Sequence, residues 1–333
     1  MIADLLPAYF ALVMATGVLA IAAATLGWQV LTWPLVVVAA IAYVVLWTLN
    51  GLRLARYPGR VLADLQDHAR GPGFFTVVAA TCILGTACVV VLQRPAAASL
   101  LWVLGVALWV VVMYAFFAAV VTRENKPSLE AGINGAWLIA TVATQSISVL
   151  GCFVADRFGA GREIVLFVSL AMYLLGAMLY LSIITLIFYR FTFVHLTGEE
   201  LTPPYWISMG AVAITTLAGS VLILQAGQWP LVREIRPFLA GFTLFFWSAG
   251  TWWIPLLLLL GFWRHVLQRV PIAYDPQYWG MVFPLGMYTL STVRLSQALD
   301  LPWLLAIPRA FFWFALAAWM ATFAGLVRRL FAR

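Results

Sequence analysis

The chain has 333 residues, of which 65% are hydrophobic and only 9% are charged, and its formal net charge is +7. A typical soluble domain carries about 25% charged residues. This composition therefore excludes a water-soluble enzyme and a disordered chain. The hydrophobic runs are long and do not alternate with polar residues, which argues against a transmembrane β-barrel. The sequence predicts an all-α integral membrane protein.

Ten hydrophobic runs are long enough to cross a bilayer, which takes about 20 residues of helix. They lie near residues 8–27, 33–51, 74–93, 99–121, 134–155, 164–189, 205–226, 237–261, 279–298 and 305–326. The loops after the first, third, fifth, seventh and ninth runs are short. We therefore expect one transmembrane domain over residues 1–333, with ten transmembrane helices arranged as five consecutive helical hairpins.

The lysines and arginines are unevenly divided between the two predicted sides of the membrane. Twelve of the 19 lie at the termini or in the loops after even-numbered runs, and seven lie on the other side. The positive-inside rule then predicts an inner-membrane protein with both termini in the cytoplasm. The excess positive charge reports this orientation, and no nucleic-acid partner is expected.

The odd-numbered runs differ in composition from the even-numbered ones. The odd runs hold 17 Ser and Thr and 11 aromatic residues, whereas the even runs hold 9 and 26. Small and hydroxylated helices suit either close packing or a water-filled lumen, and bulky aromatic helices suit lipid contact. We expect five odd helices inside a ring of five even ones. Because the bias recurs in all five odd runs, a central conduit is favoured over packing alone.

Chemistry common in other membrane proteins is missing from these runs. No carboxylate lies in the middle of any run, and His68, His195 and His265 all fall in or beside loops. Pumps for protons or cations place carboxylates inside the bilayer, and haem-binding bundles need histidine ligands there. We therefore expect no metal and no other cofactor. Hydroxyls, backbone N–H groups and distant positive charge favour anions instead.

Arg294, at the outer end of the ninth run, is a candidate for attracting anions into an outer vestibule. The competing interpretation is that its side chain extends along the helix to the lipid headgroups.

Three segments carry a resemblance to a known family: PAYFALVMATGVLAI (7–21), PPYWISMGAVAITTLAG (203–219) and YWGMVFPLGMYTLST (278–292). Together with the five hairpins, they make the whole chain resemble the tellurite-resistance and C4-dicarboxylate transporter family, which includes the slow-type anion channels of plant guard cells. The resemblance implies quasi-fivefold symmetry around a central pore. It also implies a homotrimer in the lipid bilayer, with one pore in each protomer.

The resemblance further implies that a phenylalanine on the ninth helix closes the pore. Phe283 is the matching residue, with Tyr288 in reserve, and Gly17 is the small residue expected to face the gate. Pro284 and Gly286 flank Phe283 as kink-forming residues. One threonine from each odd run is a candidate for the pore lining: Thr16, Thr81, Thr144, Thr216 and Thr289.

The sequence thus predicts a gated anion channel or transporter for chloride, nitrate, C4-dicarboxylates such as malate, or tellurite. No enzyme is expected, because the chain has no nucleophile motif, metal-binding motif or nucleotide fingerprint. Two alternatives stay open. One is a proton-coupled C4-dicarboxylate carrier, which would need a titratable group along its path, and the other is a membrane scaffold or sensor that conducts nothing.

Overall fold

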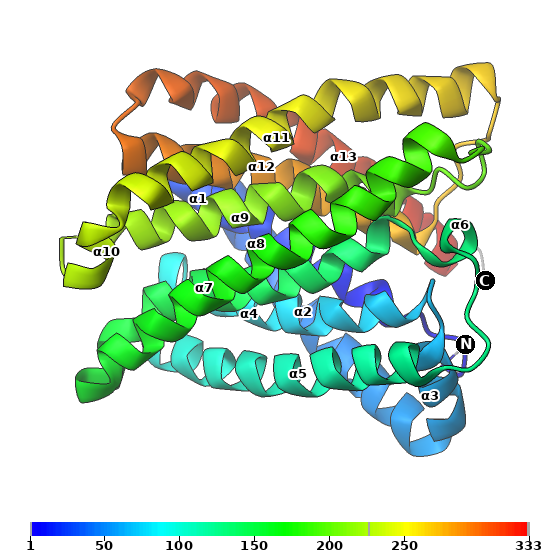
Figure 1. Cartoon of the computed structure of the whole chain (residues 1–333), viewed down its shortest axis with the longest axis horizontal. Helices are drawn as coiled ribbons and strands as arrows, with labels where there is room; N and C mark the ends of the chain where they lie inside the picture. The colour runs from blue at the N-terminus through cyan, green and yellow to red at the C-terminus, as the bar shows by residue number, and fades with distance from the viewer. Residues whose placement is uncertain (1, 226, 332–333) are drawn as a thin grey trace.

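The computed structural model describes residues 2–225 and 227–331, and every regular element in this part of the chain is helical (Figure 1). Five helices with few bulky aromatic residues form an inner group: α1 (Ala11–Thr25), α4 (Phe75–Val90), α7 (Ile139–Val154), α9 (Ile207–Leu224) and α12 (Trp279–Leu299). Five longer helices surround them: α2 (Gln29–Arg56), α5 (Pro95–Thr122), α8 (Arg162–Phe193), α11 (Arg236–Phe262) and α13 (Ala306–Phe331).

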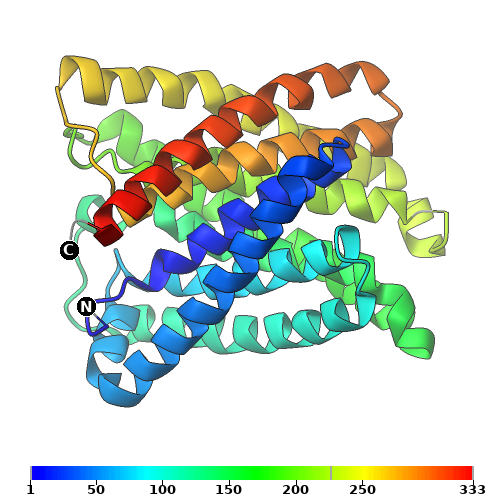
Figure 2. The same cartoon turned by 180° about the vertical axis from the view of Figure 1, so that it is seen from behind.

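Each inner helix packs against the outer helix that follows it in the chain, which makes five hairpins. The inner helices also pack against one another in the order α1, α4, α7, α9, α12 and back to α1, so they form a closed ring. Figures 1 and 2 show the outer helices on both sides of this ring. The predicted all-α fold of five hairpins around a central axis is confirmed.

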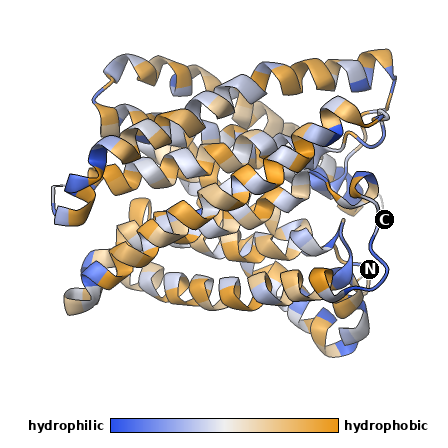
Figure 3. Cartoon of the chain, in the orientation of Figure 1, coloured by the Kyte–Doolittle hydropathy of each residue, from blue (hydrophilic) through white to orange (hydrophobic). Residues whose placement is uncertain are grey.

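The two groups of helices differ sharply in burial. In α1, α4 and α9, each taken with the turn before it, 78% to 94% of the most hydrophobic 18-residue stretch is buried. In α2, α5, α11 and α13 the buried share of that stretch is only 22% to 33%. Figure 3 shows that the exposed outer helices are hydrophobic along most of their length and that hydrophilic residues gather at the two ends of the molecule. The outer helices therefore present their hydrophobic surface to lipid.

Eight helical segments of the described chain are long and hydrophobic enough to cross a membrane. One of them, Gly135–Phe193, contains both α7 and α8, which are joined through the short 3-10 segment η4 (Ala155–Gly161). The less hydrophobic α12 is not among the eight. All ten expected ranges overlap a long helix, and the crossing of the membrane by all ten stays a prediction.

A short 3-10 turn precedes every inner helix. These turns are η1 (Pro7–Phe10), η2 (Gly71–Phe74), η3 (Gly135–Leu138), η5 (Pro203–Trp206) and η7 (Pro276–Tyr278). All except η3 carry proline in the first or second position, where its fixed φ favours a helical start and its missing N–H costs nothing. The turn η1 and the last turn of α13 lie at the end of the molecule where the inner helices begin (Figures 1 and 2).

The remaining short elements lie in the connections between the long helices. They are α3 (Pro58–Gln66), α6 (Leu129–Gly132), α10 (Pro230–Glu234), the π-helical turn η6 (Trp263–Leu267) and η8 (Pro302–Leu305).

Glycine lies at each contact between neighbouring hairpins of the inner ring, either in the inner helix or, for Gly135, in the turn η3 that precedes α7. In each case a Cβ atom on the glycine would lie less than 3 Å from an atom of the next hairpin. The pairs, in ring order, are Gly17 with Ile83, Gly85 with Leu150, Gly135 with Pro204, Gly210 with Pro284, and Gly286 with Val18. Small residues therefore set how closely the inner helices approach.

Replacing Gly135 should destabilise the protein, because a Cβ there would lie 2.3 Å from the carbonyl oxygen of Pro204, and backbone cannot move aside as a side chain can. We expect Gly135→Ala to lower the free energy of unfolding by roughly 1–3 kcal/mol. The matched control is Gly241→Ala on α11, where nothing lies within 4 Å and alanine is the better helix former. Thermal unfolding of the detergent-solubilised protein measures both, and equal melting temperatures for the two variants would contradict this account of the ring.

Candidate functional site

The five turns that precede the inner helices surround a cavity of about 610 Å³, here called the vestibule. Each turn contributes to its wall: Pro7 and Ala8, Gly73, Ala136, Pro204, and Pro276 with Gln277. The lining residues farthest along their helices are Met14 on α1, Val142 on α7 and Phe283 on α12, so these mark the inner end of the vestibule. The large entrance to the ring therefore ends at Phe283, whose side chain is buried.

Two arginines and one carboxylate also line the vestibule. Arg190, in the last turn of α8, is buried; its Nη1 donates 2.6 Å to the carbonyl oxygen of Ile133 and also hydrogen-bonds the Tyr205 hydroxyl. Its Nη2 lies 3.5 Å from Glu200 Oε1, and its Nε is buried without a partner. Arg70 is the second arginine. Because the positive ends of five helices face the same space, the vestibule favours negative charge.

Glu200 is held in its ionised form. Its carboxylate accepts hydrogen bonds from the backbone N–H and the hydroxyl of Thr197, both at 2.9 Å. These bonds are the main cause that lowers the pKa of Glu200 below its ordinary value of 4.5, and the positive charge of Arg190 acts in the same direction. The vestibule therefore keeps this negative charge at neutral pH.

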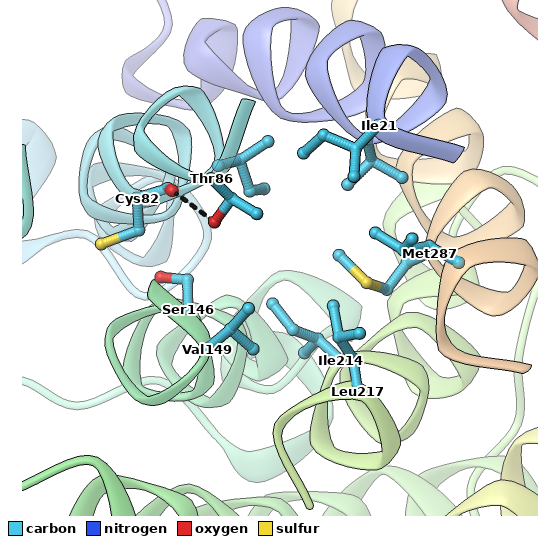
Figure 4. Close-up of a pocket in the computed structure, with 11 residues that line it drawn as sticks. Ile21, Cys82, Thr86, Ser146, Val149, Ile214, Leu217 and Met287 are labelled. Carbon is cyan, nitrogen blue, oxygen red and sulfur yellow. Dashed lines mark hydrogen bonds between the residues drawn. The ribbon is translucent and has the colours of Figure 1, made fainter. Parts of the chain in front are cut away.

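Deeper in the inner ring lies a second space of only about 10 Å³, here called the central cavity (Figure 4). That is close to the smallest volume that holds one water molecule. All five inner helices contribute to its lining: Val18 and Ile21, Cys82, Ile83 and Thr86, Ser146 and Val149, Ile214 and Leu217, and Met287 and Leu290. Met287 follows Phe283 by four residues, or about one helical turn of ~6 Å, so along α12 Phe283 lies between the linings of the two cavities.

The lining of the central cavity is almost entirely apolar. The two hydroxyls in it are already paired within their own helices, because Thr86 donates 3.0 Å to the carbonyl oxygen of Cys82 and Ser146 donates 2.7 Å to that of Ala143. Figure 4 shows the sulfur of Cys82 turned away from the centre. An apolar constriction this narrow disfavours water and is too small for a hydrated ion.

The five threonines expected to line the pore lie elsewhere. Within the described chain, none of them lines either cavity, and all five are fully buried. Three pair with aromatic side chains of outer helices: Trp319 donates to Thr16 at 2.9 Å, Trp109 donates to Thr144 at 2.8 Å, and Tyr43 shares a hydrogen bond of 2.9 Å with Thr81. Thr216 and Thr289 donate to carbonyl oxygens of their own helices. Three of the five hydroxyls therefore join an inner helix to an outer one, and none of the five lines either cavity.

The other expected residues around the gate are placed as follows. Gly17 faces Ile83 on α4 and has no atom of Phe283 within 4 Å of the position of a Cβ. Pro284 packs against Gly210, and Gly286 packs against Val18, so both serve helix contacts on either side of α12. Tyr288 points outward, with its hydroxyl 2.8 Å from that of Thr251 on α11.

Arg294 lies in the last third of α12 and donates 2.9 Å to Gln297 Oε1, with its guanidinium 5.7 Å from the ring centre of Phe153. It lines neither cavity. The polar lining residues of the two cavities that the sequence did not predict include Thr86, Ser146, Arg70, Arg190 and Glu200. The sequence places Arg190 at the edge of a loop, and the two hydroxyls cannot be told from the other Ser and Thr residues spread over the inner helices.

The chain matches the family model described as voltage-dependent anion channel over residues 4–327. The chain belongs to this family. An uncharacterized membrane protein of Mycobacterium tuberculosis is 40% identical over 154 residues, which cover 46% of this chain and 78% of that protein. The resemblance inferred from the sequence is confirmed.

Two more distant relatives extend over nearly the whole chain. An uncharacterized transporter of Methanocaldococcus jannaschii is 22% identical over 97% of this chain and 94% of its own length. A sulfite efflux pump of Trichophyton rubrum is 23% identical over 96% of this chain and 88% of its own length. The family and these relatives support anion transport as the general function, within a multi-pass membrane protein.

The pairing of inner threonines with outer aromatic residues has a measurable consequence. Thr144→Val leaves the buried Trp109 N–H without an acceptor and should lower the free energy of unfolding by about 1–3 kcal/mol. Trp109→Phe should also destabilise, and the double variant should cost less than the sum of the two single variants. Chemical unfolding of the three variants in detergent measures the cycle. Full additivity would mean that the two side chains do not interact.

Proposed function

We propose that this protein is an anion channel or transporter whose path follows the axis of the inner ring, and that Phe283 closes this path. The observation that carries the proposal is the position of Phe283, between a vestibule of about 610 Å³ and a central cavity of about 10 Å³ to which all five inner helices contribute. The apolar lining beyond Phe283 forms a second part of the barrier. Together they make the structure a closed state.

The charge at the vestibule supports anions as the substrate class. Arg70 and Arg190 outnumber the single carboxylate, Glu200, among the charged residues that line it. Five helix starts add partial positive charge directed at the same space. No Asp or Glu among the described residues lines the central cavity, so a cation would meet no compensating charge there.

Among the substrates, we propose chloride, nitrate and C4-dicarboxylates such as malate, with tellurite a further candidate. Pockets of about 300–1,000 Å³ hold whole small organic molecules, so the vestibule has room for a dicarboxylate. A relative carries the name sulfite efflux pump, which adds sulfite to the anions worth testing. In the cell we propose an inner-membrane homotrimer with both termini, and therefore the vestibule, on the cytoplasmic side.

Opening requires Phe283 to move, and the local structure makes α12 easiest to deform there. Pro284 has no N–H, so the helix loses the hydrogen bond to the carbonyl four residues earlier. A helix that lacks one such bond bends at lower cost. We propose that bending at Pro284 carries the Phe283 ring out of the path.

Truncating the gate should open the path. Phe283→Ala should raise anion current in planar bilayers by an order of magnitude or more, because it removes the bulkiest part of the barrier and leaves only the short apolar lining beyond it. Phe283→Leu keeps an apolar side chain of similar bulk and should stay closed. Tyr288→Phe, which changes the reserve candidate, should behave like the wild type.

Two results would contradict the proposed role of Phe283 as the gate. Folded, inserted Phe283→Ala protein that conducts no more than wild type would favour the non-conducting scaffold or sensor. Equal anion currents in the Phe283→Ala and Phe283→Leu variants would show that the bulk of the side chain at this position does not matter.

A proton-coupled carrier is the second candidate, because Glu200 supplies a titratable group in the vestibule. In the channel account Glu200 only opposes the positive potential. For an anion about 8 Å from the Glu200 carboxylate in water, the repulsion is worth roughly 0.5 kcal/mol. Glu200→Gln should therefore raise anion conductance about twofold at low salt and should have no such effect at 1 M salt.

The pH dependence separates the two candidates. Since the pKa of Glu200 is lowered below 4.5, its carboxylate stays ionised from pH 7 down to pH 5. Wild-type conductance should therefore show no step from Glu200 in that interval and should rise toward that of Glu200→Gln only below about pH 4.5. A transport step near neutral pH that Glu200→Gln abolishes would favour the proton-coupled carrier.

A further inference from the structure

A separate pocket of about 310 Å³ lies beside the first hairpin, on the side of α2 and α3. It is here called the α2–α3 pocket. Its wall includes Ala3, Asp4, Arg53, Arg60, Asp64 and Arg70. The pocket is distinct from the vestibule, and Arg70 is the lining residue that the two share. Neither the gate nor the anion path uses the other charged residues of this pocket.

Arg53, in the last turn of α2, is the most unusual of these residues, because only 2% of its side chain is exposed. Its Nη2 donates 2.5 Å to Asp64 Oδ2, and its Nε donates 3.1 Å to the backbone carbonyl oxygen of Ala3. Its Nη1 is buried and has no partner. A buried N–H group of a cation without an acceptor is costly, so this atom lacks an oxygen ligand.

The other charges of the pocket leave a positive excess. Arg70 also pairs with Asp64, at 2.7 Å, so a single carboxylate serves two guanidinium groups. Arg60 pairs with Asp4, and both of these side chains are more than 60% exposed. An exposed ion pair of this kind contributes little and separates easily. Three guanidinium groups thus face two carboxylates, one of which is readily displaced.

We propose that the α2–α3 pocket binds a phosphate-bearing anion, and that the headgroup of an anionic phospholipid is the source that its surroundings favour. Guanidinium groups match phosphate oxygens in geometry and charge. A phosphate oxygen would supply the acceptor that Arg53 Nη1 lacks, and Arg60 would exchange Asp4 for a second oxygen. The proposal does not depend on Phe283 or on transport.

The surface next to the pocket suits a lipid. The short helix α3 follows directly after α2, and the exposed side chains of Leu54, Tyr57 and Leu62 surround this turn. Apolar side chains beside arginines at the end of a hydrophobic helix are typical of the membrane interface, where anionic headgroups lie. Because Arg70 also lines the vestibule, an occupied pocket would alter the charge that anions meet there.

Binding of short-chain lipid to the delipidated full-length protein in neutral detergent tests this proposal without a transport assay. The probes are dihexanoyl-phosphatidylglycerol, zwitterionic dihexanoyl-phosphatidylcholine and inorganic phosphate, each titrated by microscale thermophoresis. Arg53→Gln would leave Asp64 with one partner fewer in a buried site and endanger folding, so Arg60→Gln is the test variant. Arg56→Gln is the matched control, because Arg56 is exposed, lies on the same helix end and does not line the pocket.

We expect phosphatidylglycerol to bind and phosphatidylcholine to bind at least several-fold more weakly. Arg60→Gln should weaken phosphatidylglycerol binding about tenfold, the loss of one charge-assisted contact, while Arg56→Gln stays within twofold of wild type. Inorganic phosphate that competes with the same dependence on Arg60 would support the phosphate site and make free phosphate its ligand. Equal losses in the two variants, or no preference for phosphatidylglycerol over phosphatidylcholine, would overturn the proposal.

Discussion

The close approach of the five inner helices is the constraint on which the rest of the structure depends. Each contact between neighbouring hairpins of the ring has a glycine at which an added Cβ would lie within 3 Å of the neighbouring hairpin, so that the neighbour would have to shift. Inside a bilayer the hydrophobic effect does not drive helices together, so tight packing of small residues has to do so. The same tightness leaves only about 10 Å³ at the centre of the ring.

The hydrogen bonds between the two rings follow from the same arrangement. Trp319, Trp109 and Tyr43 of the outer helices bond to buried threonines of the inner helices. A tryptophan N–H in a lipid environment needs an acceptor, and a threonine hydroxyl on a buried helix is one of the few within reach. These three hydroxyls therefore face outer helices, while the lining at the axis is mostly apolar and its two hydroxyls, Thr86 and Ser146, bond within their own helices. The result is an axis that excludes water unless the ring expands or Phe283 moves.

Much of this architecture could be predicted from the sequence. Run lengths and loop lengths indicate the hairpins, and the contrast in Ser, Thr and aromatic content separates the inner helices from the outer ones. Phe283 was placed by resemblance, and the structure puts it where the vestibule ends.

The rotation of each inner helix could not be predicted. An inner helix is buried on every side, so its polar residues can face either a lumen or an outer helix. Thr144, which bonds to Trp109, and Ser146, two residues later at the central cavity, therefore look alike in the sequence. The compositional bias was also interpreted as a sign of a polar lumen, although glycine packing and inter-ring hydrogen bonds account for it. Arg190 was missed because it reaches the vestibule from an outer helix, through contacts with Ile133 and Tyr205 that lie far away in the sequence.

Cysteine accessibility tests the central claim, that the axis runs past Phe283 to Met287 and not past the threonines. In a protein whose three native cysteines are replaced, single cysteines would be placed at Gln277 in the vestibule, at Met287 in the central cavity and at Thr289. Each would be treated with a water-soluble thiol reagent, with and without Phe283→Ala. The account predicts that the cysteine at 277 reacts in both backgrounds, that at 287 only when Phe283 is truncated, and that at 289 in neither. Reaction at 289 as fast as at 287 would place the path elsewhere and contradict it.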